Sequence, residues 1–183
     1  MALFGATGSR SDPLKGYNFL ISLLDSSSSL ALAVNIAALA ITDTPAGGFS
    51  ECSGLEMSLD IEEYKEGGRN GEYLKFPTRV KWSNITLKRG IGSSTTLWDW
   101  HYGFVEGKGR RRDGIIILQD DTHTPHNIWY FRRGLPMKYT GPSLNATQNS
   151  VAIEAIEIAH EGLYQVPAVG LINDAAKLVR GLL

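Results

Sequence analysis

The sequence predicts a mainly β fold, a small antiparallel β-barrel or sandwich with one flanking α-helix. Two observations predict it. Glycine is over-represented, at 20 of 183 residues, which is about 11% against roughly 7% in an average protein, and many of these glycines separate short apolar runs. In the clearest segments, apolar and polar residues alternate with a period of two, which is typical of strands with one covered face.

The clearest alternation runs through residues 53–62, after a first strand that is expected over Tyr17–Leu24. Its apolar positions alternate with polar and acidic ones: Leu55, Met57, Leu59 and Ile61 against Glu56, Ser58, Asp60 and Glu62. Side chains of successive strand residues point to opposite faces. We therefore expect the apolar side to face the core and the other side to form a row of carboxylates.

The segment Arg79–Arg89 changes phase in its middle. Its apolar positions move from Val80 and Trp82 to Ile85 and Leu87, so that one residue is inserted at Ser83–Asn84. Such a shift turns every following side chain to the other face. The pattern predicts either a β-bulge or a strand that crosses between two sheets.

Further strands are expected in the second half of the chain. The continuous apolar run 115–118 predicts a strand that is covered on both faces, and the turn-rich residues 120–127 lead to a partner strand at 128–131. Residues 137–140 and 151–159 complete the set. Pro136 is expected to mark a break or an edge position, because proline lacks the N–H that a central strand donates.

One helix is expected over Leu97–Val105, where Thr96 and Asp99 have the spacing of a capping box. The helix has two apolar stripes, namely Leu97, Trp100, His101 and Phe104 on one side and Trp98, Tyr102 and Val105 on the other. A surface helix needs only one such stripe. Two interpretations remain open: a helix buried deeply in its own core, or a helix that also packs on a neighbouring subunit.

We expect one domain over residues 1–163, with an inserted arm at 25–46 and an extension at 164–183. The arm has a serine run followed by alanine and aliphatic residues, and its periodicity does not decide between a hairpin and a short helix. Beyond Pro167, apolar residues recur at spacings of three and four, which predicts that the extension is helical. A chain of this length can bury a sizeable core without staples.

Composition excludes several classes of protein. The formal net charge of −1 argues against a dedicated nucleic-acid binder. Cys52 is the single cysteine, so no internal disulfide can form. The longest apolar stretch, residues 30–41, is shorter than the roughly 20 residues that a membrane-spanning helix needs. The first residues contain no recognisable secretion signal, and we expect the protein to be made in the cytoplasm.

Residues with catalytic potential do not form a constellation. His123 and His126 lie beside Asp120 and Asp121, but a proline-containing turn is a poor scaffold for metal ligands, so solvated turn residues are the preferred interpretation. No nucleophile elbow and no glycine-rich phosphate loop is present in the sequence. The sequence therefore predicts neither an enzyme nor a catalytic, cofactor or metal site.

A basic corner is the strongest charged feature. It comprises Lys108, Arg110, Arg111 and Arg112, and Arg132–Arg133 could join it across a sheet. A solvated corner between helix and strand is one interpretation. Contact with phosphate, or with acidic residues of a neighbouring subunit, is the other.

Seven short segments, taken in order, resemble one known family. They are residues 11–19, 48–56, 63–69, 84–90, 97–100, 139–147 and 151–162. Together they resemble the tail tube protein family of contractile-tailed phages, which includes the inner tube proteins of phage-derived extracellular contractile injection systems. The resemblance covers about residues 11–24 and 47–163.

The resemblance implies a structural subunit of hexameric rings that stack into a hollow inner tube. It implies no catalysis and no cofactor. The implied partners are further copies of the chain, a contractile sheath protein, baseplate or spike and tube-terminating proteins, and translocated DNA or protein cargo in the lumen. Because of the additions at 25–46 and 164–183, a main tube subunit and a baseplate-proximal tube initiator both remain open. A monomeric β-barrel that binds a ligand is the alternative from another class.

If the chain forms rings, parts of its surface must contact neighbouring subunits or line the lumen. The segment Glu62–Phe76 has three glycines and seven charged residues, so we expect a loop that becomes ordered against the adjacent subunit or the next ring. The expected inter-subunit residues are Glu63, Tyr64, Lys65, Arg69, Glu72, Tyr73, Trp98 and Tyr102. We expect Glu56, Asp60 and Glu62 to face the lumen. The alternatives are that they face the sheath or pair with the basic corner of a neighbour.

Overall fold

The computed structural model describes residues 13–25, 48–65, 67 and 71–167. In these ranges the elements, in chain order, are β1 (Phe19–Asp25), β2 (Phe49–Ser53), β3 (Met57–Tyr64), β4 (Leu74–Trp82), β5 (Ile85–Gly90), α2 (Thr96–Val105), β6 (Arg112–Gln119), β7 (Pro125–Thr140), β8 (Ile153–Ala159) and β9 (Gly162–Pro167). All the strand pairings are antiparallel. The prediction of a mainly β fold with one flanking helix is confirmed for the described residues.

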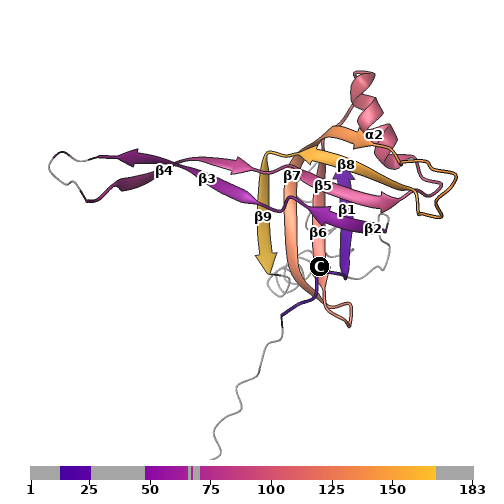
Figure 1. Ribbon diagram of the computed structural model, residues 1–183, viewed down its shortest axis with the longest axis horizontal. Helices are drawn as coiled ribbons and strands as arrows, with labels where there is room; N and C mark the ends of the chain where they lie inside the picture. The colour runs from indigo at the N-terminus through magenta and orange to yellow at the C-terminus, as the bar shows by residue number, and fades with distance from the viewer. Residues whose placement is uncertain (1–12, 26–47, 66, 68–70, 168–183) are drawn as a thin grey trace, which may run out of the picture.

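Strand β7 holds the body of the molecule together. The seven-stranded sheet has the order β1-β6-β7-β8-β5-β2, with β9 also paired to β7. The first part of β7 pairs with β6 and β9, and the part from Leu135 onward pairs with β8. One 16-residue strand therefore runs through both halves of a sandwich-like body (Figure 1). The described strands do not close into a barrel, because β1 and β2 are the two ends of the sheet order.

The corner where β7 changes partners is built around Phe131, which is fully buried. A Cβ atom placed on Gly114 would lie 2.1 Å from the Phe131 ring, and one placed on Gly134 would lie 2.7 Å from it. Both positions therefore need glycine. Of the two outcomes predicted for Pro136, the break is wrong, because β7 continues through this residue. The edge position is confirmed: from Leu135 onward, β7 pairs with β8 alone among the described strands, with a register shift between Pro136 and Lys138.

The main core combines side chains of β1, β5, β6, β7 and β8 with side chains of α2. Ile85, Leu87, Ile156 and Ile158 are fully buried together with Phe131, and Leu97 and Trp100 of α2 pack on them. Ile115, Ile117 and Ile128 form a second cluster. Since Ile116 belongs to the first cluster and its neighbours to the second, β6 is covered on both faces, as its continuous apolar run predicts.

The hairpin β3–β4 forms a separate two-stranded sheet that projects from the body (Figure 1). We call this hairpin, residues 57–82, the β-arm. The first strand of the β-arm contradicts the prediction that its apolar side faces the core. Met57, Leu59 and Ile61 are 74%, 58% and 59% exposed, so the apolar side of β3 does not face the core of its own chain. Only Leu55, just before the strand, packs on the core.

The structure differs from the predicted boundaries at the loop 62–76 and at residue 164, and it confirms the predicted change at Ser83–Asn84. The expected loop Glu62–Phe76 is strand at both of its ends, because β3 extends to Tyr64 and β4 begins at Leu74. The phase shift at Ser83–Asn84 marks the crossing from the β-arm to the main sheet, one of the two predicted outcomes. Residues 164–167 belong to β9 rather than to a helical extension. Of the expected arm at 25–46, Asp25 belongs to β1 and the other residues lie outside the described residues, as does the extension beyond 167.

The helix begins one residue earlier than the predicted cap would require. Thr95, not Thr96, is the N-cap residue. The Asp99 N–H donates to the Thr95 carbonyl at 2.9 Å. The Thr95 hydroxyl donates to the Asp99 carboxylate at 2.7 Å, and the Thr95 side chain caps no backbone N–H.

A buried polar network joins the sheet to the start of the helix. Arg89 of β5 and Glu154 of β8 are 7% and 5% exposed and form an ion pair with a 2.5 Å Nε–Oε1 distance. The Tyr139 hydroxyl donates to the second oxygen of Glu154 at 2.7 Å, and Arg89 Nη2 donates to the Ser94 carbonyl at 3.3 Å. Burial and the hydrogen bond to Glu154 raise the pKa of Tyr139 to about 12. The network therefore connects β5, β7 and β8 to the segment that leads into α2.

Replacing Gly114 tests the corner. We expect Gly114→Ala to destabilise the fold by about 1–3 kcal/mol, because the added methyl group would overlap the Phe131 ring. Gly92→Ala is the matched control, since a Cβ atom placed there would meet no other atom within 4 Å. The free energy of unfolding in urea measures both. Equal stabilities for the two variants would contradict this account of the corner.

Removing one partner of the buried ion pair tests the network. We expect Arg89→Met to cost about 3–5 kcal/mol, because the Glu154 carboxylate would remain buried without its counter-charge. The double variant Arg89→Met/Glu154→Leu removes both charges and should lose less stability than the single variant. Urea unfolding compares the two. A double variant that is less stable than the single one would contradict this account, because it would show that Glu154 stabilises the fold without Arg89, through its hydrogen bond from Tyr139.

Candidate assembly surfaces

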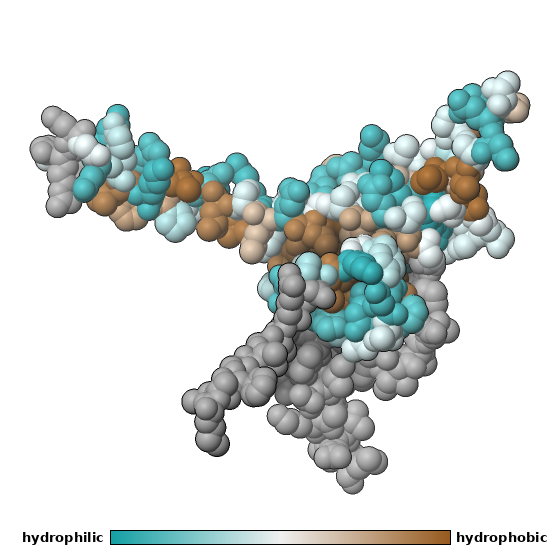
Figure 2. Space-filling model, turned by 60° about the horizontal axis from the view of Figure 1, so that its bottom comes forward, coloured by the Kyte–Doolittle hydropathy of each residue, from teal (hydrophilic) through white to brown (hydrophobic). Residues whose placement is uncertain are grey.

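The β-arm carries a bare apolar strip. Directly opposite residues of an antiparallel pair share a face, and three such pairs follow each other along the arm: Met57 with Trp82, Leu59 with Val80, and Ile61 with Pro77. Figure 2 shows apolar surface along the length of the arm. A lone hairpin is marginally stable in water, and contiguous exposed apolar surface marks an interaction site. This face is therefore a candidate docking surface.

Apolar side chains continue towards the tip of the arm on its other face. There Phe76 lies opposite Glu62, and Tyr64 lies opposite Leu74. Phe76, Tyr64 and Leu74 are 52%, 58% and 42% exposed. The two-stranded sheet has no second layer on either face, so neither group is covered by the rest of the described chain.

The structure places most of the expected inter-subunit residues at or near this tip. Glu63 lies 3.7 Å from Lys75, and the Lys65 ammonium lies 5.1 Å from the centre of the Tyr73 ring. Glu72 lies in the same tip, and Arg69 falls outside the described residues. Their role in subunit contacts stays a prediction.

The three carboxylates expected at the lumen do not form one uniform row. Asp60 forms an ion pair with Lys81 at 2.8 Å, whereas Glu56 precedes β3 and accepts a hydrogen bond from the Ser83 hydroxyl. Glu62 lies farther along the arm, opposite Phe76. The expected orientation assumed a buried apolar side in the same chain, and that assumption is wrong. Their lumen position stays a prediction.

The helix presents its second apolar stripe to the outside. Trp98, Tyr102 and Val105 are 48%, 45% and 67% exposed, while Leu97 and Trp100 are buried. Of the two interpretations, deep burial of the whole helix is therefore wrong. The Trp98 ring stacks on Tyr102 at a centroid distance of 5.7 Å and meets Tyr139 edge-on at 5.2 Å. We call Trp98, Tyr102 and Val105 the helix stripe.

The basic corner is divided among several contacts. Arg111 and Arg133 both bind the Glu161 carboxylate, at 2.7 and 2.9 Å, so Arg133 joins the corner across the sheet as expected. The Arg112 guanidinium lies 5.3 Å from the centre of the Trp100 ring. Trp100 Nε1 donates to the Arg110 carbonyl at 2.9 Å, which fixes the loop after the helix.

A pocket of about 330 Å³ lies between α2 and this loop. Its lining is mostly polar and charged: Thr96, Asp99, Trp100, Gly103, Lys108, Gly109, Arg110 and Arg112. A ligand-binding module would instead need a concave, mainly apolar pocket with a few polar groups. This pocket therefore gives little support to that alternative.

The residues with chemical potential have structural contacts. Asp120 accepts hydrogen bonds from Thr122, Thr124 and His126, and the hydrogen bonds of this turn lower its pKa. Among the described residues, no three His, Cys, Asp or Glu side chains are grouped to hold a metal ion. Burial raises the pKa of Cys52 to about 11, so its thiol is protonated at neutral pH and is a poor nucleophile.

No described helix is both long and apolar enough to cross a lipid bilayer.

Comparisons with known proteins agree with this architecture. The family model described as T4-like virus tail tube protein gp19 matches residues 18–164. The chain is similar to a solved structure of an extracellular contractile injection system, the PVC sheath–tube complex in its extended state. The identity is 26%, the match covers 85% of this chain and 92% of that one, and the TM-score is 0.67. A search of curated proteins gives no match.

Two structures of the anti-feeding prophage are also similar. Its baseplate structure contains a chain with 20% identity and a TM-score of 0.71, over 87% of this chain and 99% of that one. The structure of its tube-terminating cap contains one with 22% identity and a TM-score of 0.71, over 91% and 99%. At these identities, the two matches show a shared fold.

The family model covers most of the chain, including the β-arm, the helix and all but the last residues of β9. Such coverage establishes the family. The protein therefore belongs to the T4-like virus tail tube protein gp19 family and is a structural, non-enzymatic tube protein of phage tails or contractile injection systems, a component of the tail or tail-like particle.

Proposed function

We propose that this chain is the main subunit of an inner tube, which forms hexameric rings that stack into a hollow conduit inside a contractile sheath. The observation that carries the proposal is the β-arm, whose apolar strip is uncovered in the single chain. Because a two-stranded sheet cannot cover itself, the exposed strip favours a subunit that is completed by other chains.

The main-tube role is preferred to a specialised ring. The 26% identical relative lies in a structure of a sheath–tube complex, and a second relative of 26% identity lies in a sheath and tube terminator structure. A baseplate-proximal tube initiator remains the alternative within the same machine. The proposed partners are the sheath protein, baseplate or spike and tube-terminating proteins, and DNA or protein cargo. Synthesis in the cytoplasm, followed by assembly into the particle, completes the proposal.

Electron microscopy of the purified chain tests the proposal. A main tube subunit should form six-fold rings that stack into tubes of varying length. An initiator should stop at single or paired rings, and a ligand-binding module should remain a monomer of 20.0 kDa. Only the first result supports the main-tube role.

The tip of the β-arm provides a more specific test. Replacing residues 65–72 with a short Gly-Ser linker should leave the body folded, because the core residues all lie outside this segment. The variant should no longer form tubes if the tip contacts an adjacent subunit or the next ring. Circular dichroism checks the fold and electron microscopy checks assembly. Tubes of normal length from the variant would contradict a role for the tip.

The proposed lumen position of Glu56 and Asp60 can be tested by thiol labelling. Glu56→Cys and Asp60→Cys are made in a Cys52→Ser background, although the raised pKa of Cys52 already slows its reaction. In assembled tubes, a bulky thiol reagent should react slowly at both positions and a small neutral reagent should react fast. Fast reaction with the bulky reagent would place the side chains outside the tube, and slow reaction with both reagents would place them in a protein contact.

A further inference from the structure

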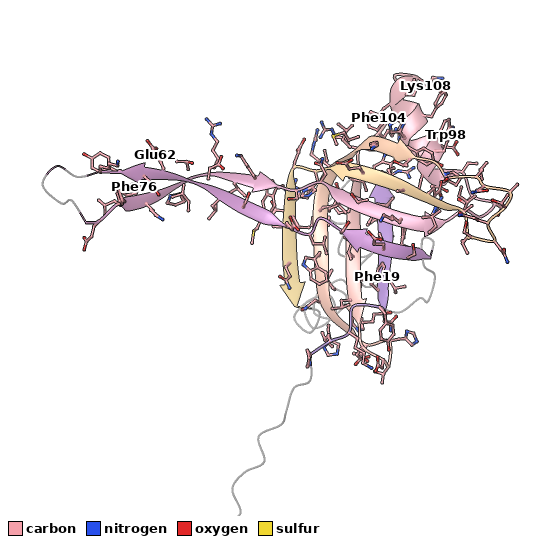
Figure 3. The ribbon with its side chains drawn as sticks, viewed as in Figure 1. Phe19, Glu62, Phe76, Trp98, Phe104 and Lys108 are labelled. Carbon is pink, nitrogen blue, oxygen red and sulfur yellow. The ribbon has the colours of Figure 1, made fainter. Side chains whose placement is uncertain are left out.

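The sheet that contains β1, β6 and β7 has a second apolar face. Successive strand residues point to opposite faces, and in β1 they alternate between the two core clusters: Phe19, labelled in Figure 3, packs on the first cluster, and Leu20 packs on the second. In β6, Ile116 belongs to the first cluster and Ile115 to the second. We call the side of the sheet that carries the second cluster the second face. Its apolar residues are Leu20, Leu24, Ile115, Ile117, Ile128 and Tyr130.

The centre of the second face is buried, although no described helix or strand lies over it. Ile115, Ile117 and Ile128 are 0%, 2% and 3% exposed. The other described elements are accounted for elsewhere: β2, β5, β8 and α2 contribute to the first cluster, β9 lies beside β7 in the same layer, and the β-arm projects away from the body (Figure 1). A single layer of strands leaves its free face open to water, so these exposures require a second layer. Because they hold for one chain, that layer belongs to the same chain.

The segment 168–183 has the sequence of such a layer. At about 100° per residue in a helix, its aliphatic residues fall on one half of the helix and its polar residues on the other. The polar residues are Asn173, Asp174, Lys177 and Arg180. One apolar half opposite one polar half is typical of a helix that covers a single surface. The apolar stretch 30–41, interrupted only by Asn35, has no polar side, so it would need cover all round.

The segment 168–183 also begins beside the second face. Cross-strand neighbours form a straight row over four strands, with Leu20 opposite Ile117, Ile117 opposite Ile128, and Ile128 opposite Val166. The row ends one residue before Pro167, after which the segment starts. Neighbouring strands are about 4.8 Å apart, so the row spans about 14 Å. A 12-residue helix would be about 18 Å long, which is enough to reach every strand of the second face.

We propose that residues 168–183 form an amphipathic helix that packs across the second face of the same chain, with Ile172, Ala176 and Val179 towards the sheet. The inference goes beyond the proposed function, because the contact lies within one subunit and does not depend on ring formation. It gives the extension a structural role. The helix seals an apolar face that would otherwise promote non-specific association of subunits.

A photo-crosslinking amino acid tests the contact in the full chain. A diazirine analogue of leucine replaces Leu20 on the second face or, in a separate protein, Leu23, which is also half-buried but packs on the first cluster. Position 20 should link to residues 168–183 of the same chain, and position 23 should not. Mass spectrometry of crosslinked peptides from a mixture of isotope-labelled and unlabelled protein identifies the linked segment and separates links within one chain from links between two copies.

Two results of the crosslinking would overturn the proposal. One is a set of links from position 20 that lead only to residues 26–47 or only to another copy. The other is the absence of links from position 20 to residues 168–183.

Replacing Val179 provides a second measurement. If the sheet covers this side chain, Val179→Asp should lower the equilibrium constant for folding about tenfold or more, because a carboxylate would enter an apolar contact. Arg180→Asp is the matched control, since it introduces the same side chain on the polar half of the helix and should change the constant about twofold at most. Urea unfolding followed by tryptophan fluorescence measures both, at a concentration where the chain is monomeric.

Equal effects of the two substitutions would overturn the proposal. Neither the crosslinking nor the unfolding requires rings or tubes. Failure of the wild-type chain to form rings would therefore count against the proposed function and not against the packing of residues 168–183.

Discussion

A two-stranded antiparallel sheet has two faces and no second layer to cover either of them. The β-arm of this protein therefore cannot bury Met57, Leu59 and Ile61 by any rearrangement within itself. This constraint separates the molecule into a body with its own core and an arm whose apolar side is uncovered in the single chain. The proposed function depends on that separation, because a subunit that covered all of its apolar surface would lack this route to assembly.

The body must remain rigid if it is to present its surfaces to neighbours. Two structural features keep the body rigid. Phe131 fills the corner of β7 between two glycines, which lets one strand belong to both halves of the sheet. The buried Arg89–Glu154 pair, together with Tyr139, ties the second half to the helix. A buried ion pair is weak evidence for stability in general, but its geometric demands are strict, which suits a network that orients Trp98.

Much of the fold could be predicted from the sequence because local patterns report local structure. The apolar run at 115–118 predicted a strand covered on both faces, and the shift at Ser83–Asn84 predicted a bulge or a crossing between sheets, of which the crossing is found. Both signals lie within one segment. For Pro136 the local pattern left a break and an edge position both open. The choice depends on which strands lie beside β7 at this residue, and β8 alone among the described strands pairs with it there, so the edge position is correct.

The candidate surfaces could be located from the sequence, but the sequence does not say which chain covers them. The second stripe of α2 was visible as surplus apolar residues, and the structure shows that Trp98 and Tyr102 remain about half exposed. The alternation in β3 was equally clear and led to a wrong expectation, because a period of two says that one face is buried without saying which chain buries it. In a protein of the tail tube family, the covering surface can belong to another subunit. A strong strand pattern on a hairpin without a core is then information about the assembly rather than about the single chain.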